Sequence, residues 1–408
     1  MTSPRVALFT DSYYEANGVG RTANALEAHA ARHDRPMLVV HGGRATQMIE
    51  SGSVVRLELR RAGRTSFALE HDLSFDLALW RHTSHVERIL RWFRPDVVHL
   101  TGPSDVGLLG AYLAWRGCLP VVGSWHTNLH EYASRRLLPR LPRLFDRHRQ
   151  VIAQAVERHS LSATLLFYAM PRVILAPNVE WAAVLGRRLR KQTFVMTRGV
   201  DTSLFSPHKR TRTDAALNVG YVGRLSAEKS VRTLASVARA LAAAERPNVR
   251  LTIVGDGNER EWLRAHVPGA VMPGVLRGEA LSEAYANMDL FVFPSETETV
   301  GNVVLEAMAS GVPVVAMARG GTQFIAGGSR GAAVARSQEE LVQLAVTLAL
   351  DADTRRVMSA AARADTFERS WAAVFATVYQ AYESAIALAN GGARTPDGHV
   401  IAVAEGQA

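Results

Sequence analysis

Cysteine is almost absent from this chain, which contains one, Cys118, among 408 residues. A single cysteine excludes an intrachain disulfide and is typical of proteins that fold in a reducing cytosol. No run of about eighteen apolar residues occurs, and this excludes an ordinary membrane-spanning helix. The N-terminal residues lead directly into an apolar strand, so we expect no signal peptide.

Modules that bind nucleic acid are missing as well. The sequence has neither a cysteine–histidine spacing for zinc nor an aromatic–basic strand of the kind that binds RNA. Basic residues nevertheless outnumber acidic ones, 47 to 38, and give a formal charge of +9. Such a charge indicates an anionic partner, and on charge alone nucleic acid, an anionic membrane and a phosphorylated substrate are all open.

The chain is long enough for two domains, and 48% of its residues are apolar, as in an ordinary globular protein. Short apolar runs alternate with helical patterns in both halves. This alternation predicts α/β domains with parallel sheets covered by helices on both faces. We expect Cys118, which stands between an apolar helix and a strand, to lie in a core.

The most informative stretch is residues 291–315. It predicts a strand buried on both faces over 290–293, a tight loop, a helix that begins at Gly301 and Asn302, and a second buried strand over 312–316. Gly311 stands where a helix often takes a left-handed terminating residue.

Two carboxylates flank the start of this helix. Glu298 lies in the loop before it and Glu306 on the helix itself. The backbone amides of the first helical residues lack partners within the helix and carry its positive end, so they suit an anion such as a pyrophosphate. These amides belong to Gly301, Asn302 and Val303. The arrangement is suited to a phosphate with a polyol on either side, whereas the structural alternative is one solvated and one capping glutamate.

The whole stretch, with its Thr-Glu-Thr-x-Gly-Asn-Val-x-Leu-Glu-Ala-Met core, closely resembles the retaining glycosyltransferases of family 4, which have the GT-B fold. The order of strand, Pro-Ser, Gly-Asn and Gly-Val-Pro-Val-Val carries this resemblance, since two glutamates at this spacing are common by chance. The resemblance implies a hexosyltransferase in which Glu306 holds the ribose hydroxyls and Glu298 the sugar hydroxyls. Val300 departs from the Phe usual in relatives.

A second segment carries two cations. The sequence Gly-Arg-Leu-Ser-Ala-Glu-Lys follows the strand expected over 217–223, and it resembles the donor-phosphate site of the same family. Arg224 leaves the end of the strand, and we expect Lys229 at the start of a helix over 230–243. Two preorganised cations would stabilise the charge of a departing diphosphate. The alternative is a pair of surface cations.

Three further positions resemble donor contacts of the family. Gly18, in the Asn-Gly-Val turn before a helix expected from residue 21, would approach the donor phosphate. His126 follows the strand expected over 120–125 and would lie against the donor sugar near the reacting carbon. Val275 would meet the nucleobase. Read alone, these residues are a turn glycine, a structural histidine and an apolar loop residue. Weaker candidates for acceptor contacts are Asp11, His130 and Glu131.

Two basic segments suggest a surface for lipid. Residues 135–149 interleave arginines with Leu and Phe, as in helices that lie in a membrane interface, and residues 186–191 add a second basic cluster. The alternative is a solvated basic helix whose leucines pack on the domain. Family members that glycosylate lipids at the cytoplasmic face favour the first interpretation.

The resemblance also implies the domain organisation. We expect an N-terminal acceptor-side domain over 1–197, a C-terminal donor domain over 198–370, a crossover helix over 371–388 that packs back on the first domain, and a disordered tail over 389–408. The two doubly wound domains of a GT-B enzyme face each other across a cleft, with His126 contributed by the first.

The predicted function is retaining transfer of a hexose from GDP-mannose or a UDP-hexose to a hydroxyl acceptor, such as a lipid or lipid-linked glycan at the cytoplasmic membrane face. No cofactor and no metal are expected, because the crevice loops carry no Asp-x-Asp pair. Two alternatives stay open: a phosphorylase-type GT-B enzyme acting on a disaccharide, and a catalytically silent protein that binds nucleotide sugars.

Overall fold

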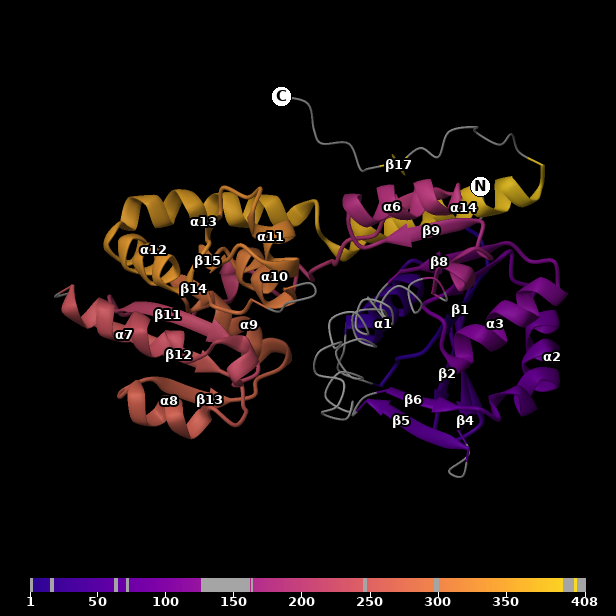
Figure 1. The fold of residues 1–408 in the computed structure, drawn as a ribbon, viewed down its shortest axis with the longest axis horizontal. Coiled ribbons are helices and arrows are strands. Elements are labelled where there is room, and N and C mark those ends of the chain that lie inside the picture. Colours follow the sequence, from indigo (N-terminus) through magenta and orange to yellow (C-terminus); the bar gives the residue numbers. More distant parts are fainter. Residues whose placement is uncertain are drawn as a thin grey trace, which may run out of the picture. The chain divides into compact units, whose positions relative to one another are not determined.

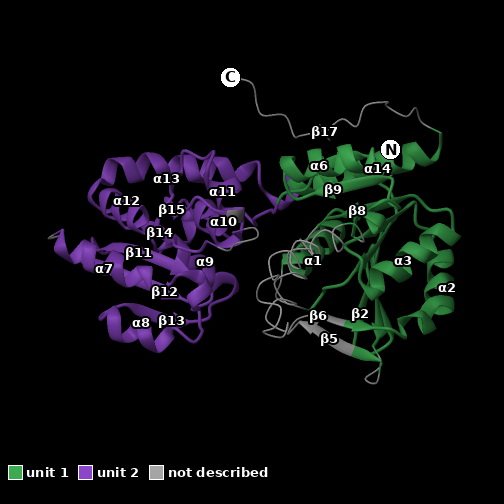
Figure 2. Ribbon diagram, viewed as in Figure 1, with its two compact units in different colours: residues 1–197, 374–408 green, residues 198–373 purple. Residues whose placement is uncertain are grey.

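The computed structural model describes residues 3–14, 18–61, 65–70, 73–125, 162, 164–244, 248–296, 301–391 and 400–401. The chain divides into two compact units, residues 1–197 with 374–408 and residues 198–373 (Figures 1 and 2). Each unit is built around its own predominantly parallel sheet.

The sheet of unit 1 has the strand order β17-β10-β9-β8-β7-β1-β2-β4-β3, and its pairs are parallel except that of β3 with β4. β1 and β7, at its centre, are buried on both faces because every residue is apolar or hydrogen-bonded. The strands are β1 (Val6–Thr10), β2 (Met37–Gly43), β3 (Gln47–Ser51), β4 (Val54–Arg60), β7 (Val97–Leu100), β8 (Val121–Ser124), β9 (Val173–Ala176), β10 (Gln192–Val195) and β17 (Val400–Ile401).

Helices cover both faces of this sheet (Figure 1). One face packs on α2 and α3 through a single apolar cluster. On the other face, His29 of α1 lies 5.2 Å from Phe375 of α14, and His99 of β7 bonds to Tyr382 of α14. The helices in the described part of unit 1 are α1 (Gly18–Arg32), η1 (Leu79–His82), α2 (Thr83–Phe93), α3 (Asp105–Arg116), α6 (Val179–Leu189) and α14 (Trp371–Ala389), the last from Val374 onward.

Several local expectations for unit 1 are wrong. The sequence did not predict β3 or the hairpin of β5 (Ser66–Glu70) with β6 (Leu73–Asp76). β3 was missed because all its residues are exposed and show no apolar alternation. Cys118 is exposed rather than in a core. The tail expected over 389–408 is described only at residues 389–391 and 400–401, so its disorder stays a prediction.

Unit 2 has a sheet of six parallel strands in the order β13-β12-β11-β14-β15-β16. Numbered from the first strand of the unit, this is the order 3-2-1-4-5-6 of a doubly wound nucleotide-binding sheet. The strands are β11 (Leu217–Val222), β12 (Val249–Val254), β13 (Val271–Gly274), β14 (Leu290–Phe293), β15 (Val314–Met317) and β16 (Ala332–Ala335).

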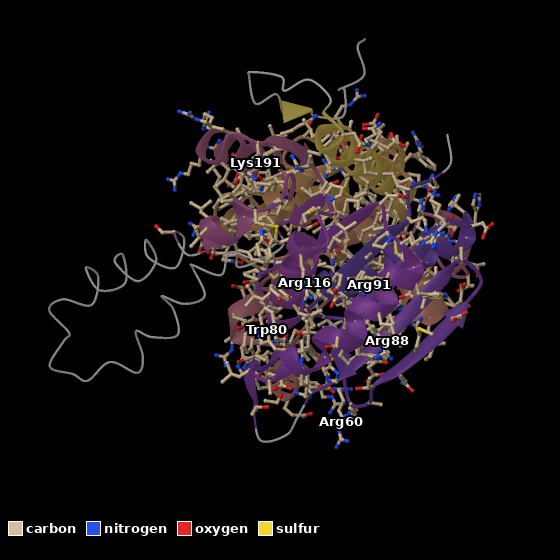
Figure 3. All side chains as sticks on the ribbon, turned by 90° about the vertical axis from the view of Figure 1, so that its right-hand side faces the viewer. Arg60, Trp80, Arg88, Arg91, Arg116 and Lys191 are labelled. Carbon is tan, nitrogen blue, oxygen red and sulfur yellow. The ribbon has the colours of Figure 1, made fainter. Side chains whose placement is uncertain are left out.

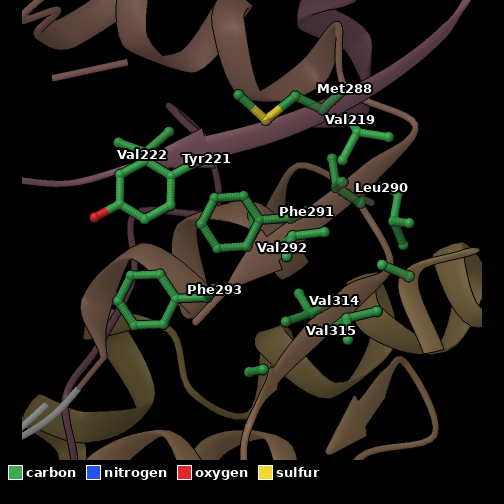
Figure 4. Packing of buried hydrophobic residues seen from close by; sticks show 14 of the residues in the cluster. Val219, Tyr221, Val222, Met288, Leu290, Phe291, Val292, Phe293, Val314 and Val315 are labelled. Carbon is green, nitrogen blue, oxygen red and sulfur yellow. The ribbon is translucent and has the colours of Figure 1, made fainter. Parts of the chain in front are cut away.

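One continuous apolar core joins this sheet to its helices. Figure 4 shows its centre, where Phe293 lies 6.0 Å from Tyr221 and 5.9 Å from Phe291. The aromatic residues therefore hold β11 and β14 together close to their carboxyl ends. The helices of unit 2 are η4 (Pro207–Lys209), η5 (Ala227–Lys229), α7 (Thr233–Ala243), α8 (Arg260–His266), α9 (Gly278–Ala286), α10 (Asn302–Ala309), α11 (Gly320–Ala326), α12 (Gln338–Leu350) and α13 (Ala352–Phe367).

Candidate active site

The strand order of unit 2 reverses direction between β11 and β14. From β11 the chain proceeds outward through β12 and β13, then returns to β14 on the other side and proceeds through β15 and β16. In open parallel sheets, ligands bind outside the carboxyl ends of the strands at such a switch point. The loops that follow β11 and β14 are therefore the first place to look for a site, and they hold most of the candidate donor residues.

The loop after β11 is held by its own strand and by the neighbouring loop. The Tyr221 hydroxyl donates to the Arg224 carbonyl at 3.0 Å, and the Leu225 amide donates to the Asp256 carbonyl at 2.9 Å. Gly255, at φ +136°, lets the two loops approach, since a Cβ there would lie 1.9 Å from the Gly223 carbonyl oxygen. This backbone is fixed before any ligand arrives.

Arg224 and Lys229 both emerge from this loop. The Arg224 side chain is 70% exposed and forms an ion pair of 3.5 Å with Glu228. Lys229 does not begin a helix as expected: it is the last residue of η5, and α7 starts only at Thr233. The interruption is Ser230, whose φ of +52° cannot continue either helix. Lys229 is thus carried by a short turn at the edge of the sheet.

The loop after β14 leads into α10, as expected. Gly301 is the residue before the helix and has a left-handed φ of +76°, and Gly311 terminates it with a φ of +71°. α10 therefore begins at Asn302, and its first amides, including that of Val303, lie at the carboxyl edge of the sheet beside the loop that carries Arg224. Amides at a helix N-terminus form a ready anion site.

Glu306 lies one turn into α10 and is 9% exposed. Its Oε2 accepts a hydrogen bond of 2.9 Å from the hydroxyl of Tyr285 on α9, which is fully buried. The ring of Tyr285 is itself held between Phe205 and Phe291, each at 5.7 Å between centroids. The carboxylate of Glu306 is therefore oriented by a rigid aromatic donor.

Three buried side-chain oxygens in the described part of unit 2 lack a hydrogen-bond partner: those of Ser226, Ser295 and Asn302. All three lie in the segments that follow β11 and β14. A buried polar atom without a partner costs free energy, so native proteins keep few of them and often keep them at functional sites. Their concentration here supports the switch point as a binding site.

The remaining candidates lie elsewhere or outside the described residues. Val275 follows β13 and is 61% exposed, on the same edge of the sheet as Arg224 but two strands away. Gly18 is in unit 1, where α1 begins three residues earlier than expected. Outside the described residues are His126, Glu298, His130 and Glu131, together with the basic segment 135–149.

Comparison with known proteins decides the family. Residues 216–351 match the family model described as "Glycosyl transferases group 1", and residues 16–204 match "Glycosyltransferase Family 4". A GDP-mannose-dependent alpha-mannosyltransferase from Mycobacterium tuberculosis is 31% identical over 94% of this chain and 97% of its own length. The chain belongs to glycosyltransferase family 4.

Other relatives agree with this assignment. A sulfoquinovosyl transferase from Arabidopsis thaliana is 32% identical over 77% of the present transferase and 61% of its own length. Among solved structures, a sucrose-phosphate synthase from Thermosynechococcus elongatus superimposes with a TM-score of 0.67 at 19% identity, covering 94% of this chain and all of its own. The resemblance seen in the sequence is confirmed, and so is the GT-B fold. The protein is a glycosyltransferase that uses a nucleotide sugar.

In unit 1 of the transferase, Asp11 lies at the equivalent switch point, between β1 and β7. The Thr101 hydroxyl donates to its Oδ1 at 2.9 Å. Burial raises the pKa of Asp11 above its ordinary value, although this hydrogen bond lowers it. The carboxyl group is well placed to bind a polar group at the carboxyl edge of the first sheet.

Sequence reasoning missed residues whose roles depend on distant partners. Besides Tyr285, Gln338 donates to the Pro294 carbonyl at 3.1 Å and to Glu296 at 2.9 Å, and so supports the loop after β14. Arg319, which follows β15, pairs with Glu296 at 3.2 Å. A buried tyrosine does signal the need for a polar partner, but no local pattern says which one.

The second basic cluster is less open than its composition indicates. The ammonium group of Lys191 donates to the carbonyls of Ala169, at 2.5 Å, and Pro171. Burial lowers its pKa. Among the described helices, none has the length and apolar character to cross a bilayer, and within the described residues no three His, Cys, Asp or Glu side chains are grouped to hold a metal.

Proposed function

We propose that this transferase moves mannose from GDP-mannose to a hydroxyl group of a lipid or lipid-linked glycan, with retention of the anomeric configuration. The observation that carries the proposal is the likeness to GDP-mannose-dependent alpha-mannosyltransferases over nearly the whole chain, at 29% and 31% identity for two relatives that each match 94% of it. A UDP-hexose is the competing donor.

The donor roles follow the elements of unit 2. Glu306, oriented by Tyr285, binds the ribose hydroxyls, and Val275 contacts the base. Arg224, Lys229 and the first amides of α10 bind the diphosphate. The remaining contacts are proposed for Gly18 at the phosphate, Glu298 at the sugar hydroxyls and His126 near the reacting carbon.

The proposed reaction breaks the bond between the anomeric carbon and the diphosphate oxygen. Negative charge grows on that oxygen as the sugar acquires oxocarbenium character, and Arg224 and Lys229 stabilise it where a metal would otherwise be needed. The acceptor oxygen attacks the same face of the sugar and forms the new glycosidic bond. Its proton passes to the leaving phosphate, so no protein base is required and no metal or cofactor takes part.

The acceptor is proposed to lie at a cytoplasmic membrane surface, with the enzyme bound to it peripherally. The formal charge of +9 supports this assignment, because the cytoplasmic leaflet carries anionic lipid.

A thermal-shift screen of nucleotide sugars tests the donor. A ligand at about 100 times its Kd stabilises the native state by about 2.7 kcal/mol. GDP-mannose should raise the melting temperature more than UDP-glucose or UDP-galactose at equal concentration. A larger shift with a uridine donor contradicts the proposed nucleotide. NMR of the product's anomeric centre then tests retention.

Two substitutions test the residue roles. Arg224→Ala should chiefly lower kcat, by about 100-fold or more, and weaken nucleotide binding by less, because a donor aimed at developing charge acts mainly in the transition state. Glu306→Ala should instead weaken nucleotide-sugar binding. The matched control is Arg239→Ala, which removes an exposed arginine two turns along α7 and should leave both parameters unchanged. Normal activity in either test variant contradicts its role.

A further inference from the structure

Large apolar side chains are exposed on one face of unit 1, formed by η1, α2 and α3. The chain has seven tryptophans, and the three that are more than a third exposed all lie here: Trp80 at 46%, Trp92 at 55% and Trp115 at 70%. Trp80 contacts Tyr112 edge-on at 5.4 Å, and Tyr112 lies 6.1 Å from Trp115. These contacts join η1 and α3 into one aromatic surface.

Exposed arginines occur on the same helices, and Figure 3 shows Arg88, Arg91 and Arg116 in one view with Trp80. Arg88, Arg91 and Arg116 are all exposed. The carboxylate of Glu87 pairs with Arg91 at 2.7 Å and with Arg116 at 3.7 Å, and so connects α2 to α3. Two guanidinium groups therefore share one carboxylate, and with exposed Arg88 the face keeps a positive charge. We call Trp80, Trp92, Trp115, Arg88, Arg91 and Arg116 together the α2–α3 face.

The fold does not need these residues on the surface. α2 buries Val86, Ile89, Leu90 and Phe93 against the sheet, and α3 buries Val106, Leu109 and Leu113. Trp115 is on the side of α3 opposite these residues, Trp92 is exposed on the flank of α2, and Trp80 is exposed on η1. Exposed apolar groups gathered in one place, rather than scattered singly, mark an interaction surface. Indole rings beside arginines are suited to a boundary between an apolar phase and water.

We propose that the α2–α3 face docks on an anionic lipid bilayer, with the indoles entering the headgroup region and the arginines contacting lipid phosphates. The positive charge of the face complements an anionic surface. It argues against a second copy of this chain, because a symmetric pair would place the two guanidinium clusters opposite each other. The docking site deepens the proposed function by giving the lipid acceptor a surface, but the adhesion itself requires neither donor nor acceptor.

Vesicle co-flotation of the full chain tests this surface. The chain should bind phosphatidylcholine vesicles that contain phosphatidylglycerol, bind pure phosphatidylcholine far less, and lose binding as salt is raised. The variant Arg88→Gln/Arg91→Gln/Arg116→Gln should bind about 100-fold more weakly, from about fivefold for each cation near the surface. Trp92→Ser/Trp115→Ser should also reduce binding and leave its salt dependence in place.

A matched control removes three exposed arginines elsewhere in unit 1: Arg172→Gln/Arg187→Gln/Arg188→Gln. It should bind vesicles like the unchanged protein. If this variant loses binding as strongly as the first, adhesion is a matter of net charge or of α6, and the assignment to the α2–α3 face is overturned. Thermal unfolding of each variant excludes misfolding as the cause.

Cys118 offers a second measurement, because it is the single cysteine of the chain, is exposed and follows Arg116 by two residues. An environment-sensitive fluorophore attached there should shift to shorter wavelength on anionic vesicles. Vesicle binding without that shift overturns the proposed orientation. Equal affinity for single-stranded oligonucleotides overturns lipid as the partner.

The outcomes separate docking from catalysis. If the triple arginine variant loses vesicle binding but still cleaves the nucleotide sugar in detergent solution, the docking proposal is supported independently of the donor. If the unchanged protein turns over GDP-mannose but ignores vesicles, docking fails and the proposed transfer stands. If the unchanged protein binds vesicles but no nucleotide sugar, the docking proposal stands and the proposed transfer fails.

Discussion

The hydrogen bond from Tyr285 to Glu306 offers the sharpest test of how the donor site is built. Tyr285→Phe removes one hydroxyl and keeps the ring, so the contacts with Phe205 and Phe291 at 5.7 Å should persist. What disappears is the donor 2.9 Å from Glu306 Oε2. If Glu306 binds the ribose, as proposed, a loosened carboxylate should bind it less well.

The size of the effect follows from the burial of both partners. A hydrogen bond to a charged group contributes about 1.5–3 kcal/mol, and both side chains here are at most 9% exposed. We expect the free energy of unfolding to fall by about 2 kcal/mol. If about half of that also appears in binding, the Kd for GDP should rise by roughly fivefold, since 1.4 kcal/mol is about tenfold.

Titration calorimetry with GDP measures the binding term, and urea denaturation measures stability. A double-mutant cycle with Glu306→Ala, which removes the acceptor, separates the two roles, because neighbours that share a hydrogen bond are not additive. In the Glu306→Ala background, Tyr285→Phe should change the Kd by less than twofold. The full-length protein serves for every arm of the cycle.

The reasoning fails if Tyr285→Phe lowers stability as expected but leaves the Kd for GDP unchanged in the native background. Tyr285 would then only anchor α10 to α9. It also fails if the Kd rises equally in both backgrounds, because the effect would not pass through the carboxylate.

Three further outcomes can be measured. Burial lowers the pKa of His99 to about 3, whereas a histidine in the unfolded chain titrates near 6.5. Below pH 6.5 the unfolded chain therefore binds more protons, and the free energy of unfolding should fall by about 1.4 kcal/mol per pH unit as acid is added. His99→Gln should remove this slope in urea titrations between about pH 6 and 4. Gly255→Ala should lower the free energy of unfolding by about 2 kcal/mol or more, since its Cβ would lie 1.9 Å from the Gly223 oxygen. Gly269→Ala is the control, because Gly269 also has a positive φ, +81°, but its Cβ would have no atom within 4 Å, and it should cost about 1 kcal/mol. Equal losses in the two variants would mean that backbone strain alone is responsible. Ser295→Ala should leave stability unchanged or raise it by about 1 kcal/mol, because the removed hydroxyl has no partner, and a clear loss in denaturation would refute that assignment.

Much of unit 2 was predictable because it is encoded locally. A buried apolar run, a glycine and a helical pattern occur in succession around Gly301, and the structure has β14 and α10 there. Parallel strands bring their carboxyl ends to one edge, so the loops of Arg224 and Glu306 had to be neighbours once β11 and β14 paired. That pairing is a tertiary fact, yet the family resemblance implied it.

Errors occurred where local pattern and environment disagree. Lys229 was expected at the start of a helix because the residues from Lys229 to α7 show no interruption in the sequence. Ser230 nevertheless takes a left-handed conformation and ends η5 before α7 begins. Cys118 appeared apolar enough for a core, but it ends α3 with a φ of +52° at the surface. Neither conformation has a distinct signature in the neighbouring residues.

By itself the sequence determined the α/β class and placed Arg224 and Glu306 after buried strands, because strand, turn and helix signals act over a few residues. Only the tertiary structure decided that Tyr285 supports Glu306, and that Trp80 of η1 and Trp115 of α3 both lie beside Tyr112. A side chain becomes buried, bonded or exposed according to what packs on it from distant parts of the chain. That information lies in the whole fold rather than in any spacing along it.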